Sequence, residues 1–456
     1  MKYQCFGTGG MPKPACNYLG VAVMNVFGRF SVLIAGSLFL ITCAADPEDN
    51  VDPNALAPNA STPTWSQLLG GARDDYGNAM AIDSSGNSYI TGVSHGDMDE
   101  NYNFGDTTDS NSSSDMFIAK YGSTGVKAWS KLIGTPSNDM GYGIAIDSNN
   151  NIYVTGGTNG SLSGTNAGNE DCFIAKYDSE GNEKWIKQFG SIGFERANDI
   201  AVDSAGNIYV TGYSDGNIFT NTNLGKADVL VGKFDSEGQI VWVKTFGTIE
   251  LDKANGVAVD EEFNVYVTGY TEGTFESSPN QGKKDIFIAK LDSAGTQQWL
   301  KLIGGAETDS GNAIAADKDG NIYVTGHLGG NFFLGKYNTA SKEVWPAVTF
   351  GGFSMDSGND IVLDESGNIY ATGTTENITF DGLISSGGAE IFVIMYDNNG
   401  VKQWSKLFGS SDVNHGNSIA TRYDGNKSVY VAGDTVGDYG SNPSNGRHDA
   451  LIMKIQ

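Results

Sequence analysis

The amino-acid sequence predicts an all-β protein, a seven-bladed β-propeller of four-stranded antiparallel blades. One observation is that tryptophan recurs at intervals of 46–64 residues over most of the 456-residue chain. A second is that a tyrosine follows each tryptophan 24–26 residues later, with a glycine three residues beyond that tyrosine. A fixed period of this length is typical of propellers and solenoids. The seven tryptophans are Trp65, Trp129, Trp185, Trp242, Trp299, Trp345 and Trp404.

Each repeat contains four short runs of strand-forming residues. In one copy these runs are Cys172–Tyr177, Trp185–Phe189, Asp199–Val202 and Ile208–Thr211. The turns between paired runs read Asp-x-x-Gly, as in Asp178–Gly181 and Asp203–Gly206. Asp favours the first position of a type I turn and Gly supplies a positive φ, so each turn closes a tight hairpin. Four antiparallel strands per copy favour a propeller over residues 65–456, with a β-solenoid as the alternative.

The repeated residues resemble a known family. The strings D-x-F-I-A-K-Y-D-x-x-G-x-x-x-W and G-x-A-x-D-x-x-G-N-x-Y-V-T-G are similar to the bacterial β-propeller repeat called SBBP. The resemblance covers residues 65–456 and implies a propeller fold in a bacterial envelope setting, without a shared catalytic activity. The D-x-x-G-x-x-x-W part also resembles the tryptophan-docking motif of quinoprotein propellers, and we find no dedicated quinone or calcium site of that class.

The repeat also predicts how the ring is held together. Each tryptophan is expected on the outermost strand, docked against the neighbouring blade, where burial removes about 150–250 Å² from water. The last copy ends at Asp449–Gln456, a third strand without a fourth. Trp65–Leu69 is therefore expected to complete the last blade and to join the two ends of the ring.

The N-terminal region is expected to direct export. Residues 1–42 have the form of an export signal, since Arg29 precedes an apolar run, 30–42, that is shorter than the roughly 20 residues needed to span a bilayer. Residues 1–23 are expected to be an over-extended start, because Met24 gives a compact signal. Leu40–Cys43 resembles a bacterial lipoprotein box, which implies an acylated Cys43; an ordinary signal with an unmodified cysteine is the alternative.

The segment after Cys43 is expected to be a tether. Residues 43–64 are rich in Pro, Asn, Asp and Ala, lack aromatic residues, and predict a lipidated cysteine followed by disordered chain. These features predict a lipid-anchored protein of the bacterial cell envelope, in the outer membrane, attached to the membrane without spanning it.

The net negative charge of the chain limits the classes of ligand that it is expected to bind. The net charge is −26, and it becomes −29 from Cys43 onward because Lys2, Lys13 and Arg29 precede Cys43 and every acid follows it. Nucleic acid is excluded as a partner, since phosphate binding needs clustered bases. A protein or glycan ligand stays open, and a cationic or neutral partner is favoured.

Several motifs have a structural interpretation. Gly92–Gly96 and Gly212–Gly216 match G-x-S-x-G, yet both stand at a strand end in an all-β chain, so a nucleophile elbow is not expected. The four histidines have no ligand-like spacing. The sequence 317–321, DKDGN, resembles the start of a calcium loop, but its equivalents in other copies are hairpin turns. No cofactor is predicted. Binding of calcium is left open, and the sequence does not tell whether the chain holds a metal ion.

An acid precedes the first strand in six copies: Asp75, Asp139, Glu195, Asp252, Asp309 and Asp356. These acids are interpreted as caps for backbone groups between blades. The alternative is a ring around the channel mouth that attracts cations.

Only one interval in the repeat varies strongly, the loop between the second and third strands. Strand parity places these loops and the six acids on one face and all Asp-x-x-Gly turns on the other. The long first loop, 95–115, supplies candidate ligand-binding residues, and the short loop of the fifth copy is expected to expose two phenylalanines in a notch. The candidates are Asp97, Asp99, Glu100, Asp106, Asp109, Phe332 and Phe333.

The sequence therefore favours a non-enzymatic binding or scaffold protein of the envelope, with no catalytic residues. A calcium-stabilised adhesin that uses the acidic loop is one alternative. An envelope hydrolase or lyase that uses the acidic ring is another.

Overall fold

The computed structural model describes residues 61–99, 101–104, 113–275, 278–352, 354–377, 379–385, 388–410, 412–422 and 427–456, with three short strands near the N-terminus. Those strands, β1 (Val23–Met24), β2 (Phe30–Ile34) and β3 (Ser37–Phe39), form one sheet in a unit spanning Met1–Asp52. The second unit is Pro53–Gln456. Cys43 lies outside the described residues, so its acylation stays a prediction. Among the described residues no helix is long and apolar enough to cross a bilayer.

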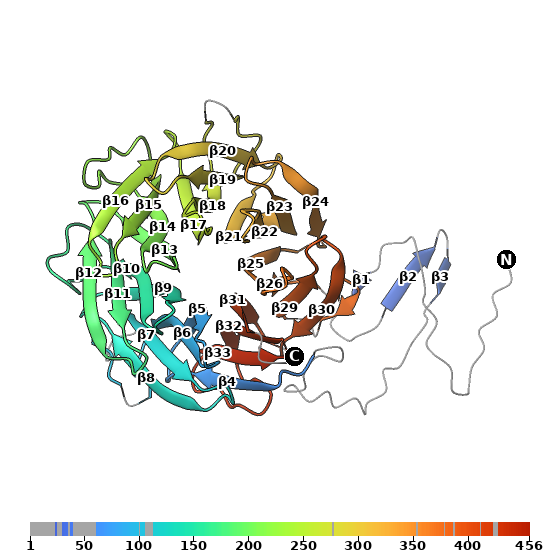
Figure 1. Cartoon of the computed structure of the whole chain (residues 1–456). Coiled ribbons are helices and arrows are strands. Elements are labelled where there is room, and N and C mark those ends of the chain that lie inside the picture. The colour runs from blue at the N-terminus through green and yellow to red at the C-terminus, as the bar shows by residue number, and fades with distance from the viewer. Residues whose placement is uncertain are drawn as a thin grey trace. The chain divides into compact units, whose positions relative to one another are not determined.

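The second unit is a ring of seven four-stranded antiparallel sheets, as the sequence predicts (Figure 1). We call the strands of each blade a, b, c and d from the centre to the rim. Blades 1 to 3 comprise β5 (Asp75–Ile82), β6 (Ser88–Ser94), β7 (Asp115–Tyr121) and β8 (Lys127–Ile133); β9 (Asp139–Ile146), β10 (Ile152–Thr158), β11 (Asp171–Tyr177) and β12 (Glu183–Phe189); and β13 (Glu195–Val202), β14 (Ile208–Ser214), β15 (Asp228–Phe234) and β16 (Ile240–Phe246).

Blades 4 to 7 complete the ring. They comprise β17 (Asp252–Val259), β18 (Val265–Thr271), β19 (Asp285–Leu291) and β20 (Gln297–Ile303); β21 (Ser310–Ala316), β22 (Ile322–Leu328), β23 (Asn331–Tyr337) and β24 (Glu343–Phe350); β25 (Asp356–Leu363), β26 (Ile369–Thr375), β29 (Glu390–Tyr396) and β30 (Lys402–Phe408); and β31 (Asn414–Arg422), β32 (Ser428–Val436), β33 (His448–Ile455) and β4 (Trp65–Leu69). A small hairpin, β27 (Thr379–Phe380) and β28 (Leu383–Ile384), lies between strands b and c of blade 6.

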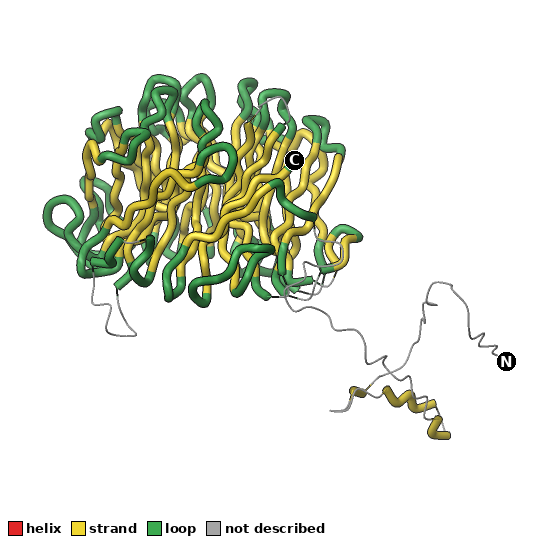
Figure 2. The backbone as a smooth tube through the Cα atoms, turned by 90° about the horizontal axis from the view of Figure 1, so that it is seen from below, coloured by secondary structure: helices red, strands yellow, loops and turns green. Residues whose placement is uncertain are grey.

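The antiparallel order gives the propeller two unlike faces, where the loops gather at opposite ends of the strands (Figure 2). The a–b and c–d turns lie on one face, which we call the turn face. The b–c loops and the d–a connections between blades lie on the other, which we call the loop face. This division agrees with the strand parity read from the sequence.

The ring closes as predicted. The strand β4 pairs with β33, with Trp65 opposite Lys454 and Leu69 opposite Ala450. The predicted tether ends earlier than expected: the Thr64 amide donates to the Lys454 carbonyl, and the Ser61 amide donates to the Leu407 carbonyl of blade 6. Residues 61–64 are therefore already held by the propeller.

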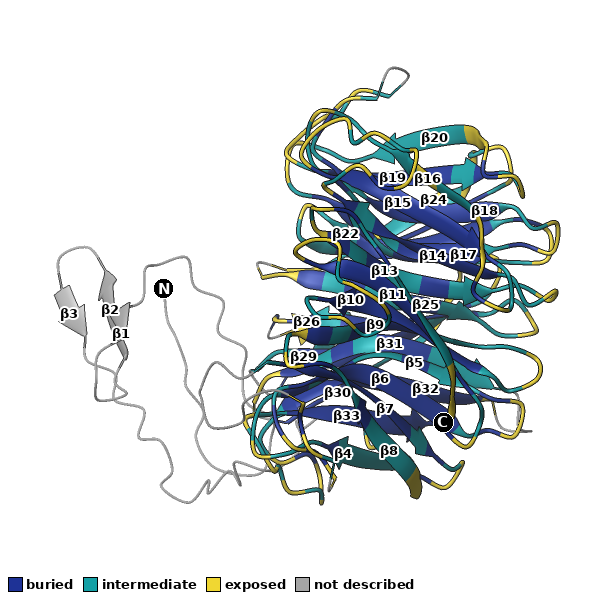
Figure 3. Cartoon of the chain, turned by 90° about the vertical axis from the view of Figure 1, so that its left-hand side faces the viewer, coloured by how far each residue is buried: buried dark blue, intermediate teal, exposed yellow. Residues whose placement is uncertain are grey.

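The tryptophans of strand d lie against the next blade. The Trp65 indole N–H donates to the Ser123 carbonyl in the c–d turn of blade 1, and the Trp242 indole donates to the Ser293 carbonyl in that of blade 4. A Cβ on Gly125 would lie only 2.7 Å from the Trp65 ring, so the turn glycine also makes room for the indole. Buried residues predominate in the strands between the two faces (Figure 3).

The glycine of strand b has a steric cause. A Cβ on Gly212 would lie 1.8 Å from the Arg196 carbonyl oxygen of strand a, where the strand pairing shifts by one residue between Ala197 and Asp199. The corresponding glycine meets the strand-a carbonyl in the other blades as well. The close approach of two backbones, rather than turn formation, explains this part of the repeat.

Candidate functional site: the channel mouth on the loop face

The six predicted acids are buried caps and do not form an open ring. Each is at most 1% exposed, which corrects the alternative of a solvent-facing ring of charge. One carboxylate oxygen of each accepts the backbone N–H of the residue four positions earlier, in the d–a connection. These donors are Gly71, Thr135, Ser191, Thr248, Gly305 and Gly352. The two G-x-S-x-G serines belong to the same network; Ser214 Oγ, for example, donates to Glu195 at 2.8 Å.

A second set of acids, missed in the sequence, begins strand c. Asp115, Asp171, Asp228, Asp285 and Asp449 each accept a backbone N–H through Oδ2, while Oδ1 makes no hydrogen bond to any described residue. Each lies at a blade junction beside the strand-a acid of the next blade. A Cβ on Gly70, for example, would lie 2.1 Å from Asp449 Oδ1 and 2.8 Å from Asp75 Oδ2. Burial raises the pKa of Asp75 and of Asp115 to about 7, and the neighbouring carboxylate adds to the shift.

Asparagines three residues after the strand-a acid connect neighbouring blades. Asn78 Nδ2 donates to the Gly141 carbonyl of blade 2 at 2.8 Å, and Asn417 Nδ2 of blade 7 donates to the Gly77 carbonyl of blade 1 at 2.9 Å. Blades 3 to 6 repeat the bond. Blade 2 departs from the pattern, because Tyr142 stands in place of the asparagine.

The residue after the strand-a acid, or after Asn414 in blade 7, is of six different types in seven blades and makes the channel mouth asymmetric. In blades 2 to 4 a run of alternating rings and cations forms what we call the cationic sector: Tyr142, Arg196, Tyr213, Lys253, Tyr270 and Lys284. The Arg196 guanidinium lies 4.9 Å from the Tyr142 ring centre, Lys253 Nζ 3.6 Å from that of Tyr213, and Lys284 Nζ 3.9 Å from that of Tyr270. Burial lowers the pKa of Lys253, and the Arg196 and Lys284 cations add to the shift.

A second group, the histidine sector, lies beside the closing seam in blade 7. The buried Asp434 carboxylate contacts two imidazoles through Oδ2, His415 Nδ1 at 2.9 Å and His448 Nδ1 at 3.2 Å. The hydrogen bond to Asp434 raises the pKa of His415. The Tyr76 ring packs on His448 with centres 4.9 Å apart. The spacing of the histidines in the sequence gave no sign of this cluster, because the strands that carry them meet only in the folded blade.

In the acidic loop of the first copy, the carboxylates of Asp97 and Asp99 form bonds to other residues of the propeller. Asp97 Oδ1 accepts the Asn103 N–H, and Asp99 pairs with Lys127 at 2.5 Å and accepts the Ser130 hydroxyl. Glu100, Asp106 and Asp109 lie outside the described residues, so their role as ligand-binding residues stays a prediction.

The expected exposure of Phe332 and Phe333 is wrong, since both side chains are 0% exposed. Strand c of blade 5 starts at Asn331, directly after a hairpin through Gly329 and Gly330 with positive φ values. The two phenylalanines therefore occupy core positions, where Phe332 contacts Phe350 and Phe392 with ring centres 4.7 and 5.3 Å apart. The shortened loop exposes no aromatic notch at these positions.

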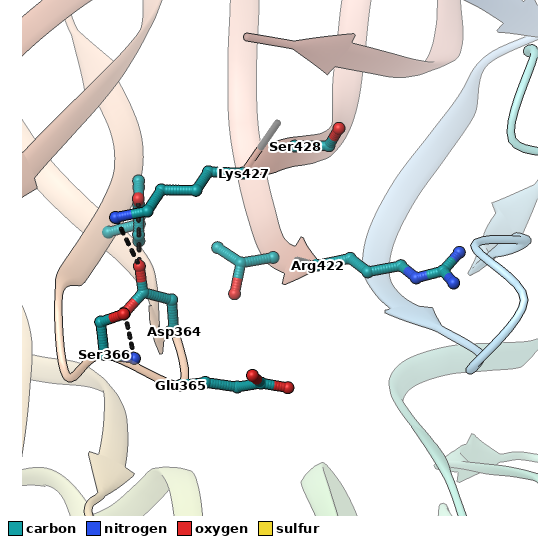
Figure 4. A pocket seen from close by; sticks show the side chains of 8 residues that line it. Asp364, Glu365, Ser366, Arg422, Lys427 and Ser428 are labelled. Atoms are coloured by element: carbon teal, nitrogen blue, oxygen red, sulfur yellow. Dashed lines mark hydrogen bonds and ion pairs between the residues drawn. The ribbon is translucent and has the colours of Figure 1, made fainter. Parts of the chain in front are cut away.

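The turn face holds a cavity of about 240 Å³ between blades 6 and 7 (Figure 4). It is lined by Asp364, Glu365, Ser366, Tyr370, Thr421, Arg422, Lys427 and Ser428. In the other blades an aspartate stands where blade 7 has Arg422, and it accepts the hydroxyl of the strand-b tyrosine, as Asp83 does from Tyr89. The Tyr430 hydroxyl makes no bond to any described residue. The degraded seventh copy thus breaks the uniformity expected of this face.

The described residues contain no cluster of three or more acidic, histidine or cysteine side chains suited to a metal ion. The sequence 317–321 is a hairpin turn, in which Asp317 accepts the backbone N–H groups of Asp319 and Asn321. Cys172 is a buried free thiol in the core of blade 2.

Comparison with known proteins agrees with the repeat. A family model described as a beta-propeller repeat, SBBP, matches residues 64–97, 128–162, 184–220, 241–276 and 298–333. Among curated proteins, the chain is 25% identical over 289 residues to an uncharacterized WD repeat-containing protein, L264, of Acanthamoeba polyphaga mimivirus, covering 46% of this chain and 21% of that protein. It is 26% identical over 254 residues to the regulatory protein FlaEY of Caulobacter vibrioides, covering 48% and 26%.

The chain thus spans about a quarter of the length of these curated relatives. Among solved structures, the Dos1 propeller covers 84% of this chain and 95% of its own at 10% identity and a TM-score of 0.47. Sqt1 from Chaetomium thermophilum covers 88% and 100% at 11% identity and a TM-score of 0.47. The chain is a seven-bladed β-propeller that contains SBBP-type repeats.

Proposed function

We propose that this chain is a non-enzymatic binding or scaffold module of the bacterial cell envelope, anchored through an acylated Cys43, and that its working face is the loop face. The observation that carries the proposal is the asymmetry of the channel mouth. The residues common to all blades are buried caps and interblade bonds, whereas the cationic and histidine sectors occur once each. A specific ligand needs such asymmetry, because a ring of identical groups offers no single orientation.

An envelope hydrolase or lyase would need an acidic ring that is open to substrate, and the six acids are buried. Their carboxylates accept backbone N–H groups, so they are engaged in capping rather than presented to a substrate. The similarity to a regulatory protein and to a WD repeat-containing protein is compatible with a binding role.

The working face is tested with paired surface variants of the full-length chain. A partner is first captured from envelope extract, identified and purified. Its affinity is then measured for a loop-face variant, His415→Ala with His448→Ala, and for a turn-face variant, Glu365→Ala with Arg422→Ala. We expect a loss of at least about tenfold, roughly 1.4 kcal/mol, only for the loop-face variant. The reverse result would move the working face to the turn-face cavity.

The anchor is tested separately. The Cys43→Ser variant is expected to leave the membrane fraction, and the intact mass of the parent is expected to show acyl chains on an N-terminal Cys43. A parent whose N-terminus is unacylated, or lies elsewhere, would contradict the anchor and leave the working face untouched.

A further inference from the structure

The cationic sector gathers three bases at one place in a chain that is acidic as a whole. Its six residues alternate ring and cation across blades 2 to 4, and the Glu170, Asp215 and Glu272 carboxylates lie around them. Outside blades 3 and 4, the residues at the positions of Arg196 and Lys253 are Tyr76, Met140, Ser310, Ser357 and His415, none of them a lysine or an arginine. The concentration of bases at one place is therefore a departure from the repeat and not part of it.

The three cations differ in how they are neutralised. Arg196 makes two bonds to the Glu170 carboxylate, Nε to Oε1 at 2.6 Å and Nη2 to Oε2 at 2.8 Å, which satisfies its charge. Lys284 lies 3.9 Å from a Glu272 oxygen, at the outer limit of an ion pair. Lys253 makes neither an ion pair nor a hydrogen bond to any residue that the structure describes. Its ammonium lies on the Tyr213 ring, and the Glu170 and Asp215 carboxylates attract it only from beyond ion-pair distance.

A half-buried ammonium without a direct ion pair is costly unless an anion is available to it. Cation–π contact with Tyr213 offsets part of this cost and fixes the position of Nζ. The Tyr213 ring carries the Lys253 ammonium and the Tyr270 ring carries the Lys284 ammonium, and neither hydroxyl donates to any described residue. A charged donor in a sector that also holds unengaged phenolic hydroxyls suits an oxyanion carried on a polar ring.

We propose that the cationic sector binds an acidic glycan, with Lys253 pairing to its carboxylate or phosphate group. The inference rests on the proposed function and names the ligand class for its working face. The negative charge of the whole chain predicts a cationic or neutral partner, but at this sector Lys253 reverses that preference. Arg196 borders the sector on its blade 2 side, where its bonds to Glu170 hold it against the Tyr142 ring.

The test uses the full-length chain and isothermal titration calorimetry with three probes: an oligosaccharide of glucuronate, the matching oligosaccharide of glucose, and inorganic phosphate. We expect the acidic oligosaccharide to bind at least about tenfold more tightly than the neutral one, and to weaken as salt rises. Equal binding of both sugars, or no binding of either oxyanion, would overturn the proposal. Inorganic phosphate binding as tightly as the acidic oligosaccharide would overturn the sugar part and leave a bare oxyanion site.

Variants locate the site. Lys253→Met is expected to lower the affinity for the acidic oligosaccharide at least about tenfold, and Lys253→Arg to keep it within about threefold of the parent. Lys184→Met makes the same change of net charge on the rim, where Lys184 pairs with Asp178, and is expected to bind like the parent. Tyr270→Phe removes one hydroxyl and is expected to lower the affinity for the acidic oligosaccharide a few-fold.

Thermal melting of each variant establishes that it is folded. If Lys253→Met is folded and binds like the parent, Lys253 is not the anion partner. The glycan test can fail while the captured partner still binds the loop-face variant more weakly than the parent. That combination of results would overturn this inference and leave the proposed function in place.

Discussion

The turn face and the loop face of the propeller differ in what they repeat. On the turn face six aspartates accept a tyrosine hydroxyl within nearly identical turns: Asp83, Asp147, Asp203, Asp260, Asp317 and Asp364. On the loop face the caps beneath the surface repeat, but the side chains at the channel mouth change from blade to blade. The comparison teaches that a feature present in every blade is explained by packing, whereas a feature present once indicates closure or recognition.

The turn face carries one informative exception. Between β33 and β4 the c–d turn is absent, and Lys406 Nζ donates to the Gln456 carbonyl where other blades have a covalent turn. The seam and the neighbouring cavity at Arg422 both belong to blade 7, the copy that departs most from the repeat.

The largest effect is expected at this seam. Deletion of Asp449–Gln456 removes the partner of β4 and exposes the edge of β32, so the whole ring should lose stability. We expect the melting temperature to fall by about 10 °C or more. Excision of residues 105–112, an equal length of the first loop, is the control and should cost little, since loop length enters only logarithmically. A truncated chain that melts within a few degrees of the parent would refute closure by β4.

A core substitution on the loop-face side comes next. Phe332→Ala should destabilise the propeller by about 3–5 kcal/mol, because it leaves a cavity against Phe350 and Phe392. Tyr102→Ala, at a side chain that is 78% exposed, should change stability by less than about 0.5 kcal/mol. Denaturant unfolding of both variants measures the difference, and similar midpoints would contradict burial of Phe332.

Substitutions of two glycines, one crowded by a neighbouring strand and one in an open connection, test whether backbone crowding determines the cost in stability. Gly212→Ala would place Cβ 1.8 Å from the Arg196 carbonyl oxygen, and we expect a cost of about 1–3 kcal/mol. Gly305→Ala meets no atom within 4 Å and has no positive φ, so it should be tolerated. Equal unfolding free energies for the two variants would show that strands a and b separate more freely than the register indicates.

The smallest effect concerns pH. The pKa of Asp115 is raised in the folded state to about 7, so the folded protein binds more protons than the unfolded chain between roughly pH 4 and pH 7. Stability from this group is greatest at the acid end and falls as pH rises through that window. Asp115→Asn should therefore flatten the dependence of melting temperature on pH by a few degrees. Asp319→Asn on the turn face is the control, and its curve should stay parallel to that of the parent.

Much of the architecture could be predicted from the repeat alone. The period gave seven blades, the turns gave their antiparallel order, and the missing fourth strand of the last copy gave the closure by Trp65–Leu69. These features depend on local residue pattern, which the sequence contains directly. The placement of the six acids at the start of strand a also followed from the pattern, but their burial did not, because it depends on how the d–a connections cover them.

The candidate site was harder to predict. The register of strand c aligns Phe332 and Phe333 with Ile286 and Phe287 of blade 4, so attention to the strand rather than to the shortened loop would have placed them in the core. The cationic and histidine sectors join side chains from different strands and blades, none of which forms a motif along the chain. The available signal was the residue after each strand-a acid, the position at which the copies agree least.

The entry of the chain at Ser61 has a mechanical consequence. Because β4 begins at the turn face, a pull on the chain before Ser61 acts on that face of the propeller. A force directed along β4 loads all of its hydrogen bonds to β33 at once, in shear. A force directed away from the sheet would instead break these bonds one pair at a time, beginning at Trp65. The bonds from Ser61 to Leu407 and from Thr64 to Lys454 meet that force first and shield the closing strand. The seam that closes the ring is thus also the joint through which a tethered propeller would bear load.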